Sequence, residues 1–406
     1  MAESIARVVR YALEDAQEAF REGLAATATG LLDIVAGYIF YSALRDMLAL
    51  TPLVLLVYPG ILSVRGVITG ILSGNLSTGL NIGSIEPSVR RPGWTLRLLV
   101  YAVFSMVFFG ALSVAAMTGL AAFVTGVHRG FPGLMITVFA TMYLSFLAVS
   151  PITIAVAFAA YRRGLDPDKI VYPIMSSTAD IVTTLIFVNV VRLVYSQGPL
   201  LHAALWGLVA LLVAGQAYVV WWLHEEEEFT THLREEILSL VMVAAIASVT
   251  GYILERMSRL IEAHSEIYAV YPAVLTTIGD AGSIVGSVGT TRLNLGYTQP
   301  GLDFYLRSAG TVLGVWAASA AMFTVYAFYA SLISPLGPAA SLPANLAVLL
   351  LANVFAIPAI FLISLTAASE TYRRGLNPDN FVNPLVSTLA DLVSTAALYL
   401  AIILVY

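Results

Sequence analysis

The chain has 406 residues, of which 59% are hydrophobic and only 11% are charged, with a formal net charge of −5 at pH 7. Soluble domains usually carry about 25% charged residues, so this composition excludes an ordinary soluble fold and indicates a multi-pass membrane protein. The sequence contains no cysteine, which excludes disulfides, thiolate metal sites and iron–sulfur clusters, and no basic patch points to nucleic acid as a partner.

The N-terminal segment, residues 1–23, is charged and lacks the pattern of a signal peptide. Its apolar residues recur at helical spacing, which predicts an amphipathic helix on the cytoplasmic side. Two interpretations are open: the helix lies on the membrane surface, or it is a solvated lead-in to the first span.

Eleven apolar segments follow in chain order, and each predicts a membrane-spanning helix. They cover residues 24–44, 52–80, 95–126, 132–161, 169–195, 199–223, 236–256, 267–291, 303–333, 343–371 and 380–406. The predicted fold class is therefore an all-α polytopic protein with about eleven transmembrane helices in the lipid bilayer of the cell membrane.

Orientation follows from the basic residues in the loops. With a cytoplasmic N-terminus, fourteen basic residues lie on the cytoplasmic side and five on the opposite side. Cytoplasmic loops of membrane proteins carry an excess of Lys and Arg, so we expect a cytoplasmic N-terminus and an extracytoplasmic C-terminus.

Two stretches of the sequence occur twice. YRRGLDPDKIVYPIMSSTADIVTT, from Tyr161, matches YRRGLNPDNFVNPLVSTLADLVST, from Tyr372, at fourteen of 24 positions. Residues 58–87 align without gaps with residues 271–300, and the two matches come in the same order. This arrangement predicts an internal repeat.

The repeat predicts the domain organisation. A first five-helix repeat covers 24–198, a linking transmembrane helix with an acidic loop covers 199–235, and a second five-helix repeat covers 236–406. An odd number of crossings would invert directly joined halves, and the extra crossing makes them parallel about a pseudo-twofold axis along the membrane normal. Such an internal pseudo-dimer favours a monomer.

Two aspartates, Asp180 and Asp391, occupy matched positions near the middle of the fifth span of each repeat. A charge at the bilayer centre costs at least ~2.5–3.5 kcal/mol on insertion scales, so such residues are typically functional. Hydroxyl groups share their helix face: Ser177, Thr183 and Thr184 near Asp180, and Thr388, Ser394 and Thr395 near Asp391. These hydroxyls either help to bind a ligand or only bond neighbouring helices together.

Other polar residues lie within the predicted spans. Asp280, in the second span of the second repeat, is a third candidate metal ligand, and the matched Asn81 and Asn294 are candidates for lining a pathway. Arg65 is either a counter-ion to an aspartate or a side chain that reaches an interface. Asp33, in the first span, either pairs with Arg65 or holds the ion ligands in place without touching the ion itself.

Carboxylates and hydroxyls are the oxygen ligands that suit a hard divalent cation such as Mg²⁺. The absence of histidine near these positions disfavours softer transition metals. The sequence therefore predicts divalent cation transport at the interface of the two repeats, with Mg²⁺ as cargo, no cofactor and no enzymatic activity. A secondary transporter for another solute is one alternative. An intramembrane aspartyl protease is another, but Thr277 stands where its G-x-G-D signature needs the first glycine.

The (D/N)PD…P…AD(I/L)V(T/S)T pattern of both fifth spans resembles the MgtE-type magnesium transporters. The two-repeat arrangement is similar to the solute carrier 41-like branch of that family. The resemblance implies a five-helix unit, a pore between the second and fifth helices, and a Mg²⁺ site at the fifth-helix aspartate, here Asp180 and Asp391. The second-span pattern of the family has Asn where this chain has Val67 and Asp280. Arg65 and the unmatched Asp280 favour a carrier coupled to Na⁺ or H⁺ over a channel, because a fixed positive charge near a pore would hinder the passage of cations.

Overall fold

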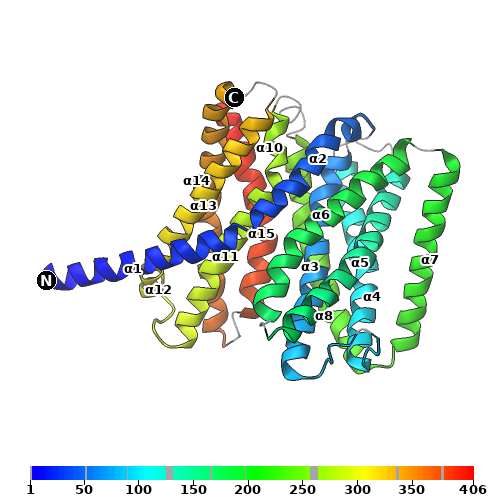
Figure 1. Cartoon of the computed structure of the whole chain (residues 1–406), viewed down its shortest axis with the longest axis horizontal. Coiled ribbons are helices and arrows are strands. Elements are labelled where there is room, and N and C mark those ends of the chain that lie inside the picture. The colour runs from blue at the N-terminus through cyan, green and yellow to red at the C-terminus, as the bar shows by residue number, and fades with distance from the viewer. Residues whose placement is uncertain are drawn as a thin grey trace. The chain divides into compact units, whose positions relative to one another are not determined.

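The structure is a computed structural model that describes residues 2–50, 53–88, 90–124, 131–164, 167–196, 198–256, 264–334, 338–375 and 379–406. The described residues form helices and connecting turns, with no strand among them (Figure 1). The chain divides into two compact units, one of residues 1–38 with 257–406 and one of residues 39–256. We call them unit 1 and unit 2.

Unit 2 contains the end of α2 and six further helices. These are α2 (Gly30–Leu50), α3 (Leu53–Ile82), α4 (Trp94–Val124), α5 (Phe131–Arg162), α6 (Pro167–Ser196), α7 (Pro199–Leu223) and α8 (Glu227–Arg256). Unit 1 contains the beginning of α2 together with α1 (Ala2–Thr27), α10 (Ser265–Ala269), α11 (Tyr271–Asn294), α12 (Leu302–Arg307), α13 (Ala309–Ile333), α14 (Pro338–Arg373) and α15 (Asp379–Val405).

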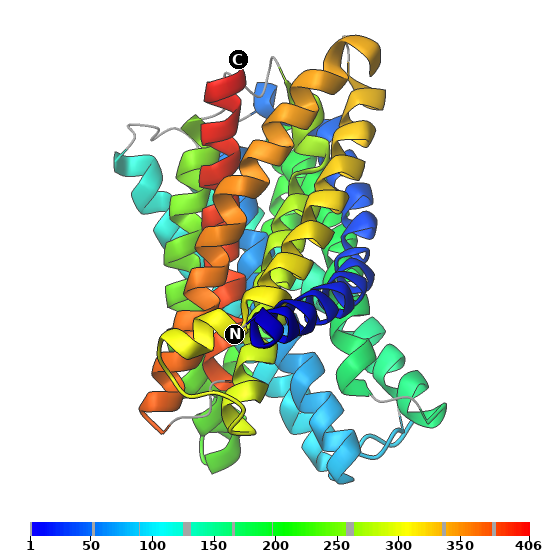
Figure 2. The same cartoon turned by 90° about the vertical axis from the view of Figure 1, so that its left-hand side faces the viewer.

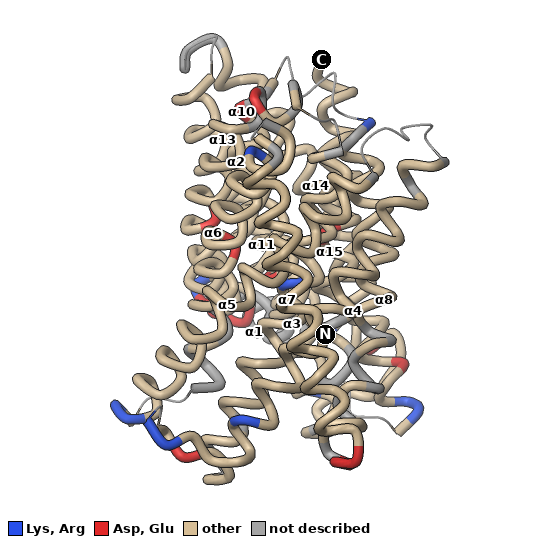
Figure 3. Tube along the Cα trace, turned by 90° about the vertical axis from the view of Figure 1, so that its right-hand side faces the viewer, with Lys and Arg blue, Asp and Glu red and all other residues tan. Residues whose placement is uncertain are grey.

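The predicted all-α polytopic fold is confirmed. Nine of the eleven predicted spans coincide with helices in the described residues that are long and apolar enough to cross a membrane. The remaining two are helical as well, but they are less apolar. The span predicted at 236–256 lies in α8, where the apolar part is only Leu240–Leu254, and the span at 267–291 lies in α10 and α11. Charged residues are sparse along the middles of the helices and concentrate toward their ends (Figure 3).

The internal repeat is visible as a repeated contact. In unit 2 the second helix of the first repeat, α3, packs on the fifth, α6, and in unit 1 α11 packs on α15. The hydroxyl groups of Tyr58 and Thr184 are 2.9 Å apart and hydrogen-bonded, and those of Tyr271 and Thr395 are 2.7 Å apart. These four residues are matched in the sequence repeat, so both repeats share the same tie between their second and fifth helices.

The boundaries of the compact units differ from those of the sequence repeats. Helix α8 begins the second repeat, yet it packs on α3 and α4 of the first repeat, where a Cβ atom at Gly251 would collide with the carbonyl oxygen of Leu56. Helices α1 and α2 begin the first repeat, yet a Cβ atom at Gly37 would collide with the carbonyl oxygen of Ala269. Gly37 and Leu56 precede Gly251 and Ala269 by 214 and 213 residues. Each unit therefore holds four helices of one repeat and the start of the other.

The N-terminal helix packs on the protein itself. Helix α1 contacts α13 and lies at a steep angle to the other long helices of unit 1 (Figures 1 and 2). Asp15 accepts hydrogen bonds from Arg292 at 2.6 Å and from the Thr311 hydroxyl at 3.0 Å. Helix α13 thus contacts α1 around residues 15–23, within the segment that the sequence interpretations assigned to the membrane surface or to water.

The linking helix α7 lies at the edge of unit 2 (Figure 1). Its Gln216 is buried, donates a 2.7 Å hydrogen bond to the Ser105 carbonyl of α4 and accepts one from the Tyr143 hydroxyl of α5. The large apolar residues on its other side are exposed: Leu200, Trp206, Leu211, Tyr218 and Trp221. This amphipathy suits a helix that attaches to the protein through one polar contact and presents the rest of its surface to lipid.

Glycine ends the fourth helix of each repeat. Gly164 follows α5 and Gly375 follows α14, with φ angles of 70° and 69°. Glycine adopts this left-handed conformation without the steric cost that a Cβ atom brings, which is why it commonly terminates helices. The YRRG motif therefore marks the turn that leads into the fifth helix.

Candidate functional site

The first-repeat aspartate is held in an ion pair. Asp180 lies on α6, and its Oδ1 atom accepts a hydrogen bond from Nη2 of Arg65 on α3. The Arg65 residue is only 5% exposed, so the pair is buried between the two helices. Of the two interpretations of Arg65, the counter-ion fits this geometry, because a side chain that reaches an interface would have an exposed guanidinium.

The second-repeat aspartate has a different neighbour at the position that corresponds to Arg65. Asp391 is half-buried on α15, and its main-chain carbonyl accepts a 2.7 Å hydrogen bond from the Thr395 hydroxyl. The gapless repeat alignment places Ile278, which is fully buried in α11, where the first repeat has Arg65. The aligned positions of the second helices therefore differ in chemistry, with Arg65 in α3 and Ile278 in α11.

The six predicted hydroxyl groups are all buried, and four of them fall into two classes. Thr184 and Thr395 bond to the tyrosines that tie the second helix to the fifth. The matched Thr183 and Ser394 are fully buried, and their hydroxyls lack a hydrogen-bond partner among the described residues. Ser177 and Thr388 are also buried. The first class serves helix packing, whereas Thr183 and Ser394 have an unused oxygen.

A second polar cluster lies in unit 1. Asp33 on α2 is fully buried, and its charge interacts with that of half-buried Asp280 on α11. Close by, the hydroxyls of Thr277 on α11 and Tyr326 on α13 are 2.7 Å apart and hydrogen-bonded. A Cβ atom at Gly30 would lie 2.7 Å from the Tyr326 hydroxyl, so α2 approaches this cluster closely. The structure therefore brings together Asp33 and Asp280, which the sequence left as separate candidates.

The remaining candidates have no described side chain. Asn81 and Asn294 lie at the ends of α3 and α11, and their side chains fall outside the described residues.

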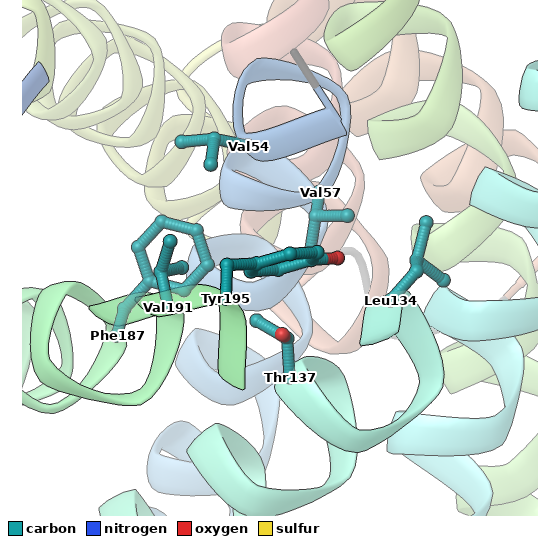
Figure 4. Close-up of a pocket in the computed structure, with 7 residues that line it drawn as sticks. All are labelled: Val54, Val57, Leu134, Thr137, Phe187, Val191 and Tyr195. Atoms are coloured by element: carbon teal, nitrogen blue, oxygen red, sulfur yellow. The ribbon is translucent and has the colours of Figure 1, made fainter. Parts of the chain in front are cut away.

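Two cavities lie within unit 2. The first is lined by Val54, Val57, Leu134, Thr137, Phe187, Val191 and Tyr195, and it contains no carboxylate among these residues (Figure 4). This apolar space does not suit a cation. The second is bordered by Arg65 and includes the hydroxyls of Thr69, Ser145 and Ser150 in its lining. Ser145 is fully buried, and its hydroxyl has no hydrogen-bond partner among the described residues.

No group of three or more His, Cys, Asp or Glu side chains is arranged to hold a metal ion within the described part of the chain. A cation in either unit would therefore rely on one or two carboxylates together with hydroxyl, carbonyl and water oxygens. Mg²⁺ accepts such a donor set, since it keeps several of its waters and typically binds one or two carboxylates.

The sequence interpretation missed two contacts between the second and fifth helices. The Tyr58–Thr184 and Tyr271–Thr395 hydrogen bonds join residues more than 120 positions apart, although the matched Tyr-Pro dipeptides were a usable signal. The hydrogen bond between Tyr326 and Thr277 could not be predicted, because nothing in the sequence relates α13 to Thr277.

Comparison with known proteins shows that the chain is similar to several members of solute carrier family 41. The chain is 22% identical to solute carrier family 41 member 2 of Xenopus laevis over 400 residues, which cover 93% of this chain and 68% of that relative. It is 22% identical to the same member of Gallus gallus over 394 residues, covering 92% and 66%. Solute carrier family 41 member 3 of Rattus norvegicus is 22% identical over 410 residues, covering 94% and 84%. The chain thus spans about two thirds of the length of the two member 2 relatives.

No solved structure matches the chain. The sequence model of the family described as "MgtE: Divalent cation transporter" matches residues 58–190 and 271–401, which begin at the two Tyr-Pro dipeptides and include both fifth-helix aspartates. Because these two regions make up more than half of the sequence, the chain belongs to the MgtE family of divalent cation transporters.

Proposed function

We propose that this protein transports a divalent cation, Mg²⁺ above others, across the cell membrane, and that Asp180 and Asp391 bind the ion at the interface of the two repeats. The single observation that carries the proposal is the duplicated setting of these two acids. Each lies on a fifth helix, and each fifth helix is tied to a second helix by the same tyrosine–threonine hydrogen bond. Family membership supports the divalent cation as cargo.

The chemistry of the donors supports the same cargo. A carboxylate within a membrane helix is costly unless a cation or a partner compensates it. Two carboxylates, with the buried hydroxyls of Thr183 and Ser394 nearby on the same helices, offer hard oxygen atoms that replace part of the hydration shell of a small divalent ion. In this proposal the protein acts as a monomer with a cytoplasmic N-terminus, and Na⁺ or H⁺ is the coupling ion.

The test is Mg²⁺ flux into proteoliposomes that contain the purified protein. We expect Asp180→Asn and Asp391→Asn each to lower the initial rate at subsaturating Mg²⁺ at least about tenfold, equivalent to ~1.4 kcal/mol of lost ion binding. Asp46→Asn is the matched control, since this aspartate is exposed and only 3.6 Å from exposed Arg192. If Asp180→Asn and Asp391→Asn both fold and retain the wild-type rate, the two aspartates do not bind the transported ion.

A further inference from the structure

We propose that His264 and Glu266 form a binding site for a divalent cation that accepts nitrogen ligands, such as Zn²⁺, at the end of unit 1 where α10 begins. The site is separate from the candidate ion ligands Asp180, Asp280 and Asp391, and the inference does not depend on the proposed function. It rests on a buried carboxylate, on an imidazole nitrogen opposite that carboxylate, and on the contacts that hold both side chains.

Three helices of unit 1 meet at this position. Helix α10 begins at the end of the unit at which α13 and α15 finish (Figure 1). Ser334, directly after α13, donates a 3.3 Å hydrogen bond to Oε1 of Glu266. The ring of Tyr406, directly after α15, stacks on the imidazole of His264 with the ring centroids 3.5 Å apart. Residues that follow two other helices therefore hold the two side chains, and such support preorganises a binding site.

The carboxylate of Glu266 is buried and only partly hydrogen-bonded. The side chain is 1% exposed, and its Oε2 atom has no hydrogen-bond partner among the described residues. Within that part of the chain its one ion-pair partner is His264. A carboxylate removed from water is costly unless cations and hydrogen bonds compensate it, so the remaining oxygen atom is suited to bind a cation.

The imidazole of His264 faces this carboxylate at a distance that fits a shared ion. Its Nδ1 atom is 3.9 Å from Oε1 of Glu266, too far for a hydrogen bond, and has no hydrogen-bond partner within the described ranges. Two ligand atoms about 2.0–2.2 Å from a tetrahedral Zn²⁺ lie about 3.4 Å apart, so a small side-chain rotation brings both groups to one ion. The His264 side chain is 14% exposed, which lets water molecules complete the coordination.

The donor pair selects the class of cation. An imidazole nitrogen suits Zn²⁺ and the neighbouring transition-metal ions, whereas Mg²⁺ and Ca²⁺ prefer sites made of oxygen atoms alone. As a ligand, His264 is neutral and carries its proton on Nε2, because Nδ1 must offer its lone pair to the metal. The charge of Glu266 then compensates part of the charge of the ion.

The site belongs to the second repeat alone. The gapless repeat alignment, continued toward the N-terminus from the two Tyr-Pro dipeptides, places Thr51 opposite His264 and Leu53 opposite Glu266. Neither an imidazole nor a carboxylate occurs at these positions of the first repeat. The pair is therefore not a copy of the duplicated acids on the fifth helices.

The experiment measures Zn²⁺ binding to the purified full-length protein, freed of metal by a chelator, by titration calorimetry with and without excess Mg²⁺. We expect one Zn²⁺ ion whose affinity Mg²⁺ leaves unchanged. His264→Phe removes the nitrogen but keeps an aromatic ring against Tyr406, and Glu266→Gln removes the charge but keeps the shape of the side chain. Each should weaken this binding at least about tenfold, since even residues that only support metal ligands contribute that much.

His224→Phe is the matched control. Nε2 of His224 lies 3.8 Å from Oε1 of Glu225, a similar separation, but these two side chains are 60% and 88% exposed. We expect this variant to bind Zn²⁺ as the wild type does. Zn²⁺ should also raise the thermal unfolding midpoint of the wild type and of His224→Phe but not of His264→Phe, because an ion that binds the folded site stabilises it.

Three results would overturn the inference: a wild type that binds no Zn²⁺, equal Zn²⁺ affinities of the wild type and His264→Phe, and a loss of binding in His224→Phe alone. Competition by Mg²⁺ for the same site would overturn the choice of a cation that accepts nitrogen ligands. If Glu266→Gln is not monodisperse in detergent, His264→Phe decides alone, because it leaves the buried carboxylate and the ring stack in place.

Discussion

At the scale of single residues, one hydroxyl pair in each repeat ties the helix that begins with Tyr-Pro to the helix that bears the aspartate. Tyr58 and Tyr271 are both fully buried, and so are Thr184 and Thr395. A buried hydroxyl that loses its partner retains the full cost of desolvation, so each pair constrains where its aspartate lies. The stability of this contact is therefore linked to the geometry of the proposed ion site.

We predict that Tyr58→Phe and Tyr271→Phe each destabilise the protein by about 0.5–1.5 kcal/mol, because each removes one buried hydrogen bond between the second and fifth helices of its repeat. The measurement is the thermal unfolding midpoint in detergent. Tyr297→Phe is the control, since Tyr297 is 68% exposed and its hydroxyl takes part in no hydrogen bond among the described residues. A loss confined to one repeat would contradict the idea that the two ties are equivalent.

Several features of the single residues were predictable from the sequence. The depth of Asp180 and Asp391 in the membrane follows from their distance to the ends of their helices. Their correspondence follows from the internal repeat. The partner of Arg65 was not predictable, because Arg65 and Asp180 are 115 residues apart and their contact depends on how α3 packs on α6. The sequence left Asp33 as a candidate partner of Arg65, which stays a prediction, and it gave no sign that the charge of Asp33 interacts with that of Asp280 within unit 1.

At the scale of helices, close backbone approach decides which elements pair. Gly251 of α8 and Gly37 of α2 lie against main-chain carbonyl oxygens, of Leu56 and Ala269 respectively, where no other residue fits. Small residues of this kind allow membrane helices to approach until their backbones touch, and van der Waals packing then stabilises the pair. The first helix of each repeat is held in this way to helices of the other repeat.

We predict that Gly251→Ala destabilises the protein by about 1–3 kcal/mol, because the added methyl group overpacks the contact with the Leu56 carbonyl. Gly215→Ala on α7 is the control. A Cβ atom there meets no other atom within 4 Å, and alanine favours a helix over glycine. Thermal unfolding of both variants in the same detergent is the measurement. Equal midpoints for the two variants would show that α8 does not approach α3 as closely as the structure indicates.

At the scale of the whole molecule, the exchange of first helices means that neither sequence repeat contains a complete compact unit. Unit 2 needs α8 from the second repeat, and unit 1 needs α1 and the beginning of α2 from the first. A repeat on its own would expose the small-residue surface that the exchanged helix covers. The halves are therefore expected to depend on each other for stability.

We predict that a fragment of residues 1–198 and a fragment of residues 199–406 are each unstable alone and assemble when they are expressed together. The cut lies between α6 and α7. It therefore keeps the contact of α3 with α6 within one fragment and the contact of α11 with α15 within the other. The measurement is co-purification through an affinity tag on one fragment, followed by Mg²⁺ flux in proteoliposomes. Two fragments that are each monodisperse alone and show separate cooperative unfolding would contradict the prediction.

The sequence by itself determined the class of the protein, its eleven helical segments, its internal repeat and its two duplicated acids. These features depend on local composition and on self-similarity, which need no knowledge of packing. Only the tertiary structure decided that Arg65 pairs with Asp180 and that the first helices are exchanged. Such contacts join residues far apart in the chain, and their free energy depends on the close approach of helices that no local pattern records.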